Sequence, residues 1–101
     1  GKTGMEQISR IMDTWRRGYP EAIASLKVVE VLDYEKGLDG LPSENVLKFI
    51  LDGGSWFCLR PSGTEPKIKF YFAAAGKAYD STAQLLQQME HEVMSEVQKT
   101  I

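Results

Sequence analysis

The residues with the clearest chemical potential lie in one short segment, Arg60-Pro61-Ser62-Gly63-Thr64-Glu65-Pro66. Arg60 offers a planar guanidinium that can hold an oxyanion through two parallel hydrogen bonds. Ser62 and Thr64 each add a hydroxyl donor, and Gly63 lets consecutive backbone N–H groups converge on an anion. A proline near each end limits the entropy that the segment loses on becoming ordered. The segment therefore has the chemistry of a phosphate-binding loop.

The same composition is also typical of an ordinary polar turn between two strands, but the flanking charges favour an anion site. Arg60 ends one predicted strand, and Lys67 and Lys69 begin the next, whereas Glu65 is the only acid in the loop. Like charges on neighbouring strands repel each other unless something negative lies between them. The cluster therefore indicates a bound phosphate or carboxylate, and the residues by themselves leave both open.

The single cysteine and the single histidine have simpler interpretations. Cys58 lies within the apolar run at residues 56–59, so we expect a small buried hydrophobic side chain. His91 lies between Glu90 and Glu92 on a helical segment, so we expect a solvated surface residue. One cysteine and one histidine allow neither an internal disulfide nor a Cys/His metal cluster. These two residues thus give no reason to expect a metal site, and His91 is expected to be neither a ligand nor a catalytic residue.

Apolar residues at helical spacing predict a helix at each end of the chain. The capping-box pattern Thr3-Gly4-Met5-Glu6 predicts the start of the first helix, and Gly18 predicts its end. The pattern Ser81-Thr82-Ala83-Gln84 predicts the start of the last helix. Because the first helix opens so close to the first residue, we expect the chain to be a piece of a longer protein.

Four strands are predicted between these helices, at residues 26–32, 46–51, 55–60 and 67–74, with a polar loop at residues 33–45. In the last of them Ile68, Phe70 and Phe72 alternate with polar residues, so Lys67 and Lys69 share one face. Short connections between the later strands indicate antiparallel pairing. We therefore expect an α+β domain over residues 1–101, with a four-stranded, mainly antiparallel sheet and two helices on one face.

Composition excludes several functional classes. The chain has 101 residues, of which 43% are hydrophobic, so it can form a single domain with its own core. A net charge of -2 argues against a nucleic-acid surface, which needs a basic excess. No apolar run approaches the ~20 residues of a membrane span, and no signal segment opens the chain. We expect a soluble, cytoplasmic protein with no nucleic-acid or membrane partner.

Residues 55–72, with the sequence SWFCLRPSGTEPKIKFYF, resemble the C-terminal domain of the α-D-phosphohexomutases, the family of phosphoglucomutases and phosphomannomutases. A looser similarity extends over essentially the whole chain. The resemblance implies a fold like that of the TATA-box-binding protein. It also implies that residues 1–101 are the C-terminal domain of a larger, multi-domain mutase.

The resemblance further implies a function. The family interconverts hexose 1-phosphate and hexose 6-phosphate through a bisphosphate intermediate. By residue-wise correspondence, the non-reacting phosphate would be held by Arg60, Ser62, Gly63 and Thr64. Lys69 matches a basic position of the following strand that is arginine in some members, and the resemblance implies that it also contacts the phosphate.

The remaining catalytic parts of such an enzyme have no counterpart in this sequence. Other domains would carry the phosphoserine, the Mg²⁺ site and the loop that recognises the sugar. The expected partners of this chain are therefore those domains and the sugar phosphate. We therefore expect the isolated chain to be inactive, with Mg²⁺ bound outside it. The alternative is a stand-alone module that binds a small anion or sugar phosphate without catalysis. In either case the loop would bind the phosphate, which many sugar phosphates share, so no particular sugar is assigned.

Overall fold

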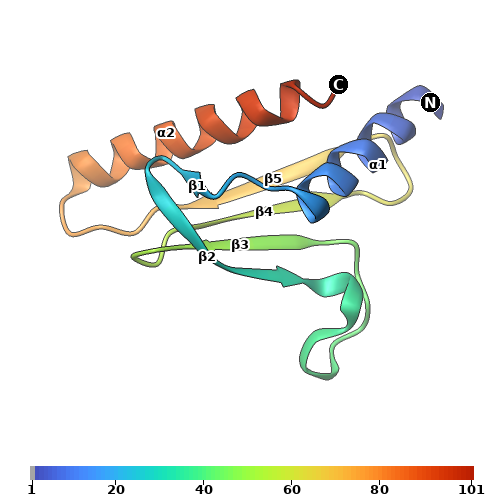
Figure 1. Cartoon of the computed structure of the whole chain (residues 1–101), viewed down its shortest axis with the longest axis horizontal. Helices are drawn as coiled ribbons and strands as arrows, with labels where there is room; N and C mark the ends of the chain where they lie inside the picture. Colours follow the sequence, from blue (N-terminus) through green and yellow to red (C-terminus); the bar gives the residue numbers. More distant parts are fainter. Residues whose placement is uncertain (1) are drawn as a thin grey trace.

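Two helices and one antiparallel sheet make up the structure, a computed structural model that describes residues 2–101 (Figure 1). The elements in chain order are α1 (Lys2–Arg17), β1 (Ala22–Ile23), β2 (Leu26–Asp33), β3 (Leu47–Leu51), β4 (Trp56–Pro61), β5 (Ile68–Ala73) and α2 (Tyr79–Gln98). Two short 3-10 helices, η1 (Tyr34–Lys36) and η2 (Leu38–Gly40), lie in the loop between β2 and β3. The predicted α+β class is confirmed.

The prediction of four strands was wrong, because the sheet has five, in the order β1-β2-β3-β4-β5. The additional strand β1 pairs Ala22 with Lys27 and Ile23 with Leu26. Its two-residue turn places Ala24 and Ser25 at positive φ, 53° and 63°. Turns of this kind usually contain Asn or Gly, so the composition of this hairpin carried no recognisable turn signal.

A bulge in β2 changes which of its side chains point to the core. The pairing with β3 shifts between Val28 and Glu30, so Val29 has no partner and is 56% exposed. Val28 and Val31 both pack against the core as a result. Bulges bend a strand and increase its twist, and in Figure 1 β2 is clearly rotated relative to β3 in a curled sheet.

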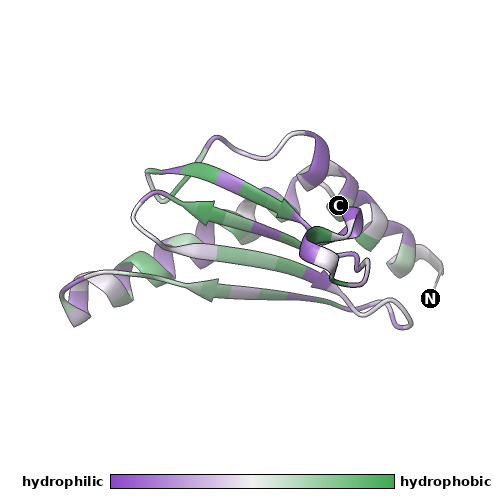
Figure 2. Ribbon diagram, turned by 90° about the horizontal axis from the view of Figure 1, so that it is seen from below, coloured by the Kyte–Doolittle hydropathy of each residue, from purple (hydrophilic) through white to green (hydrophobic). Residues whose placement is uncertain are grey.

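Both helices cover the same face of the sheet, as the sequence predicted. Apolar residues alternate along the central strands, so Phe49 and Phe57 point toward Trp15 of α1, whose ring contacts both edge-on at centroid distances of 5.5 and 5.6 Å. From α2, Met89, Val93 and Val97 enter the same core. Figure 2 views the sheet from the opposite side, with both helices behind it. That second face is therefore not covered by any element in the described residues.

Both predicted capping boxes were wrong. Helix α1 already includes Lys2 and Thr3, and α2 starts at Tyr79 after an N-cap, Ala78, that makes no side-chain hydrogen bond. Ser81 and Thr82 instead donate their hydroxyls to the Ala78 carbonyl, at 3.3 and 2.6 Å. Ser and Thr bond to nearby backbone both at caps and within the first turn, so the residue pattern does not fix which of the two occurs. The end of α1 before Gly18 is confirmed.

None of the described helices is long and apolar enough to cross a membrane. His91 is exposed on α2, as predicted.

Candidate functional site: an anion-binding loop beside an open sheet face

The hairpin of β4 and β5 positions the predicted loop. Arg60 lies opposite Lys69 and Pro61 opposite Ile68 in the antiparallel ladder. Beyond the ladder, the Ser62 amide donates to the Lys67 carbonyl at 2.9 Å. Residues 62–67 are therefore a tight extension of the hairpin, and their position follows from that of the two strands.

Helix α1 supports this loop from the other side. A Cβ added to Gly4 would lie 2.8 Å from the Cβ of Pro66, so the first turn of the helix packs directly on the loop. Only glycine permits so close an approach. Sequence reasoning had assigned Gly4 to a capping box and missed this role, because nothing in the local pattern connects it with Pro66.

The structure brings the predicted phosphate-binding residues together at the surface. All five are exposed, namely Arg60, Ser62, Gly63, Thr64 and Lys69. The Ser62 and Thr64 hydroxyl oxygens lie 3.5 Å apart, and Gly63 adopts a φ of 87°, in the region that favours glycine. Within residues 2–101 no backbone carbonyl accepts from the amides of Gly63 and Thr64. These donors are therefore available to an anion.

Positive charge gathers around the loop as the sequence predicted. Lys67 pairs with Glu65 at 3.2 Å, but both side chains are exposed and such pairs are weak. The Arg60 guanidinium makes no hydrogen bond or ion pair with any other residue of the described chain, and Lys69 lies opposite Arg60 on β5. Two adjacent cations without an acid between them attract a small anion, and an anion bound there would relieve their repulsion.

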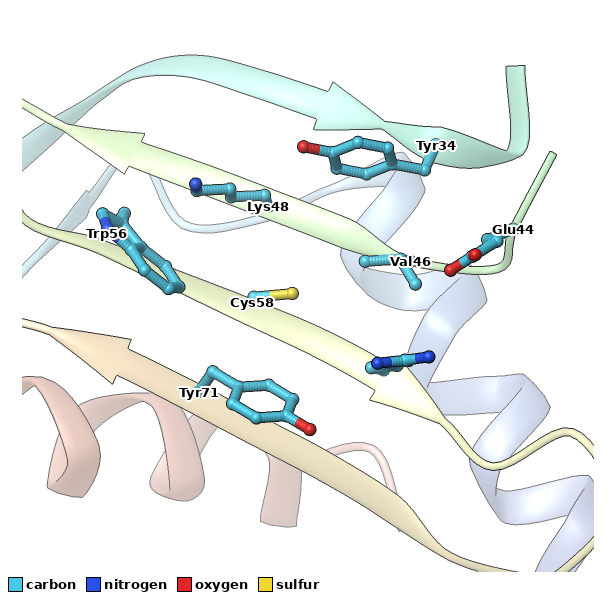
Figure 3. Close-up of a pocket in the computed structure, with 8 residues that line it drawn as sticks. Tyr34, Glu44, Val46, Lys48, Trp56, Cys58 and Tyr71 are labelled. Carbon is cyan, nitrogen blue, oxygen red and sulfur yellow. The ribbon is translucent and has the colours of Figure 1, made fainter. Parts of the chain in front are cut away.

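Three shallow depressions meet at Arg60. The loop depression, about 360 Å³, lies over the loop and is lined by Arg60, Pro61, Ser62, Glu65, Lys67, Lys69 and Tyr71. The side depression, about 250 Å³, lies between residues 61–63 of the loop and residues 44–46. The sheet depression, about 310 Å³, lies on the open face and is lined by Tyr34, Glu44, Val46, Lys48, Trp56, Cys58, Arg60 and Tyr71 (Figure 3).

Cys58 lies in the sheet depression, and the prediction of a buried side chain was wrong. Phe57 and Leu59 on either side of it point into the core, so Cys58 points to the open face and is half-buried. Burial raises the pKa of its thiol more than the charges of Lys48 and Arg60 lower it. The two-residue periodicity of a strand could have revealed this orientation, because it places Cys58 and Arg60 on the same face.

The loop between β2 and β3 is tied to α1 by a polar network. Arg16 donates from Nε and Nη2 to the carboxylate of Asp33, at 3.0 and 3.2 Å, and from Nη2 to Oδ1 of Asn45 at 2.7 Å. Partial burial alone would raise the pKa of Asp33. The hydrogen bonds from Arg16 and the Glu35 amide, with the nearby positive charges, outweigh it and lower the pKa. The network holds the wall of the side depression in place.

Comparison with known proteins gives consistent matches. The family described as "Phosphoglucomutase/phosphomannomutase, C-terminal domain" matches residues 6–94. A phosphoglucomutase of Staphylococcus haemolyticus is 38% identical over 95 residues, covering 83% of this chain and 17% of that protein. A probable phosphomannomutase of Haemophilus influenzae is 41% identical over 73 residues, covering 72% of this chain and 14% of that protein. No solved structure matches significantly. The chain thus spans less than a fifth of the length of these relatives.

Proposed function

This chain belongs to the C-terminal domain family of the phosphoglucomutases and phosphomannomutases, and we propose that it binds the phosphate of a sugar phosphate within a larger mutase. The whole enzyme would interconvert hexose 1-phosphate and hexose 6-phosphate through a bisphosphate intermediate, in the cytoplasm. The observation that carries the proposal is the exposed guanidinium of Arg60 beside Lys69, which no residue in the described part of the chain pairs with. Next to it the loop presents exposed hydroxyls and the amides of Gly63 and Thr64.

Each of the proposed phosphate-binding residues has a distinct part. Arg60 supplies a bidentate, charge-assisted pair of hydrogen bonds to two phosphate oxygens. The hydroxyls of Ser62 and Thr64 and the amides of Gly63 and Thr64 hold the same group from the loop side. Lys69 adds charge from β5 as a point cation, without the geometric preference of an arginine.

The contribution of this domain to catalysis would be positional. Holding the phosphate that does not react fixes the far end of the substrate, so that the reacting hydroxyl meets a phosphoryl donor carried by another domain. The family uses Mg²⁺, but among residues 2–101 no three His, Cys, Asp or Glu side chains are grouped as a metal site would require. We therefore assign the metal and the phosphoryl donor to other domains.

The fold itself we assign to the TATA-box-binding-protein-like class, supported by the two helices on one face of an antiparallel sheet.

Arg60→Ala in the full-length enzyme tests this function. We expect kcat/KM to fall by an amount equivalent to about 2 to 4 kcal/mol of transition-state stabilisation, the scale of a lost charge-assisted bidentate partner. Arg10→Ala is the matched control, because Arg10 is also exposed, on α1, but lines none of the three depressions. An unchanged kcat/KM for Arg60→Ala in a normally folded enzyme would show that the loop does not hold the substrate.

A further inference from the structure

We propose that the sheet depression is a second subsite, which binds the polyhydroxylated ring of the sugar whose phosphate lies in the loop depression. This inference rests on the proposed phosphate-binding function. It assigns to the chain a direct part in recognising the sugar as well as the phosphate.

The depression exists because a small residue is surrounded by large ones. Cys58 lies opposite Lys48 on β3 and opposite Tyr71 on β5. Along β4 the neighbouring side chains on the same face are those of Trp56 and Arg60. Four long side chains therefore enclose a short one, and the open face is hollow at its centre without any loss of backbone pairing.

The lining has the chemistry of a sugar-binding surface. A hexose ring has apolar C–H faces and a rim of hydroxyls, so it is matched by aromatic rings together with a few polar groups. Figure 3 shows Trp56 and Tyr71 on two sides of Cys58, with Tyr34 and Glu44 toward one end. The amino group of Lys48 lies 4.2 Å from the centre of the Trp56 ring. This contact orients both side chains at the opposite end.

The sheet depression is continuous with the phosphate site. Arg60 and Tyr71 line both the loop depression and the sheet depression. A ligand whose phosphate is held by Arg60 therefore extends onto the open face without leaving the protein surface. Each depression is at the lower end of the size of small-molecule sites, so together they suit a phosphate attached to a single ring.

The charges favour a neutral ring over a second anion. Glu44 lines the sheet depression and also the side depression, and its carboxylate would repel a second phosphate placed beside it. Hydroxyl groups, in contrast, donate to a carboxylate and accept from an amino group. A sugar ring therefore uses both Glu44 and Lys48, whereas an anion uses only one of them.

The experiment compares two phosphate esters that share the anion and differ in the ring. The 101-residue chain is titrated with methyl phosphate and with glucose 6-phosphate, and amide and indole N–H shifts are followed by NMR. Both ligands should move the amides of Ser62, Gly63 and Thr64. Glucose 6-phosphate alone should also move the indole N–H of Trp56, and it should bind roughly threefold to tenfold more tightly, the effect of one or two added hydrogen bonds.

The possible results separate the two proposals. Equal affinities, with shifts confined to the loop for both esters, overturn the sugar subsite and leave the phosphate function standing. If neither ester moves the loop amides, the phosphate function fails and the subsite fails with it.

Filling the depression provides an independent check. Cys58→Phe should remove the preference for glucose 6-phosphate over methyl phosphate, because the ring would occupy the floor of the hollow. Val29→Phe adds the same ring at an exposed position of β2 that lines none of the three depressions, and it should keep the preference. A folded Cys58→Phe chain that still prefers glucose 6-phosphate overturns the subsite.

A milder variant covers the case in which Cys58→Phe does not fold. Glu44→Gln removes the carboxylate from an exposed loop position, and it should lower the ratio of the two affinities by roughly twofold to fivefold. Glu90→Gln, on the exposed side of α2, is the control. An unchanged ratio in Glu44→Gln counts against the subsite.

Discussion

Arg60 and Cys58 lie two residues apart on the same face of β4. Arg60 is long, charged and exposed, whereas Cys58 is small and half-buried. The Arg60 guanidinium is exposed, and no side chain among residues 2–101 pairs with it, so it can bind an anion. Cys58 is half-buried among larger side chains, and its smallness shapes the surface next to Arg60. Two residues of one strand therefore determine both the charge and the shape of the candidate site.

The partial burial of Cys58 predicts how its thiol responds to pH. Because burial raises its pKa, the thiolate fraction near neutral pH is smaller than that of a free thiol. The rate of alkylation by iodoacetamide should rise with pH through a midpoint above that of the same chain unfolded in urea, and no other cysteine interferes. A midpoint equal to or below the unfolded one would contradict the described burial.

At the scale of elements, the position of the loop depends on contacts with residues outside it. Strands β4 and β5 fix its two ends, α1 contacts Pro66 through Gly4, and the Arg16 network fixes the neighbouring loop through Asp33. The geometry of the site is therefore sensitive to residues far from it in the chain.

Gly4→Ala tests the contact between α1 and the loop. Alanine favours a helix by about 1 kcal/mol relative to glycine, but its Cβ would overlap the rigid ring of Pro66. We expect little loss of stability together with shifted amides at residues 62–66 and weaker phosphate binding. Gly18→Ala is the control, because a Cβ there meets no atom within 4 Å. Unchanged loop amides in Gly4→Ala would show that the contact does not position the loop.

The Arg16–Asp33 pair predicts a loss of stability in acid. Since the folded state lowers the pKa of Asp33, its stabilisation is complete above the unfolded value of about 4 and disappears as the pH falls through the folded value. Asp33→Asn should lower the free energy of unfolding by about 1 to 2 kcal/mol near neutral pH. The difference in this free energy between the variant and the wild type should shrink as the pH falls toward about 3. Urea unfolding at several pH values measures it, with the exposed Asp13→Asn as control. A pH-independent difference would rule out the ionised pair as its source.

Local patterns predicted much of the architecture and of the loop, but not what depends on pairing between distant segments. The alternation at Ile68, Phe70 and Phe72 gave the correct face of β5, and the charges around Arg60 are gathered as predicted. Strand β1 was missed because its turn contains Ala24 and Ser25 at positive φ. The sheet depression was missed because it needs the cross-strand register of Cys58, which no local pattern supplies.

At the scale of the whole molecule, we propose that the chain provides one wall of a site whose other walls belong to other domains. Both helices lie behind the sheet, and its other face is open (Figure 2). Arg60 and Tyr71 line both the sheet depression on that face and the loop depression. The relatives are more than five times longer than the matched segment. On this proposal, a single wall would hold the end of a substrate but would not transfer its phosphoryl group.

We therefore predict that the 101-residue chain alone does not convert glucose 1-phosphate to glucose 6-phosphate, even with Mg²⁺ present. A coupled assay for glucose 6-phosphate measures this, with the full-length enzyme as the positive control. Turnover above a matched blank would mean that the chain contains catalytic groups that we have not assigned.

The central claim, that the loop binds phosphate, is tested most directly by an NMR titration of the chain with inorganic phosphate. Exposed hydrogen bonds give little net free energy after the cost of ordering, so we expect a Kd no tighter than roughly millimolar. The largest shifts should fall on the amides of Ser62, Gly63 and Thr64 and should weaken as salt is added. Shifts centred on residues 39–45, or none at tens of millimolar phosphate, would contradict the claim.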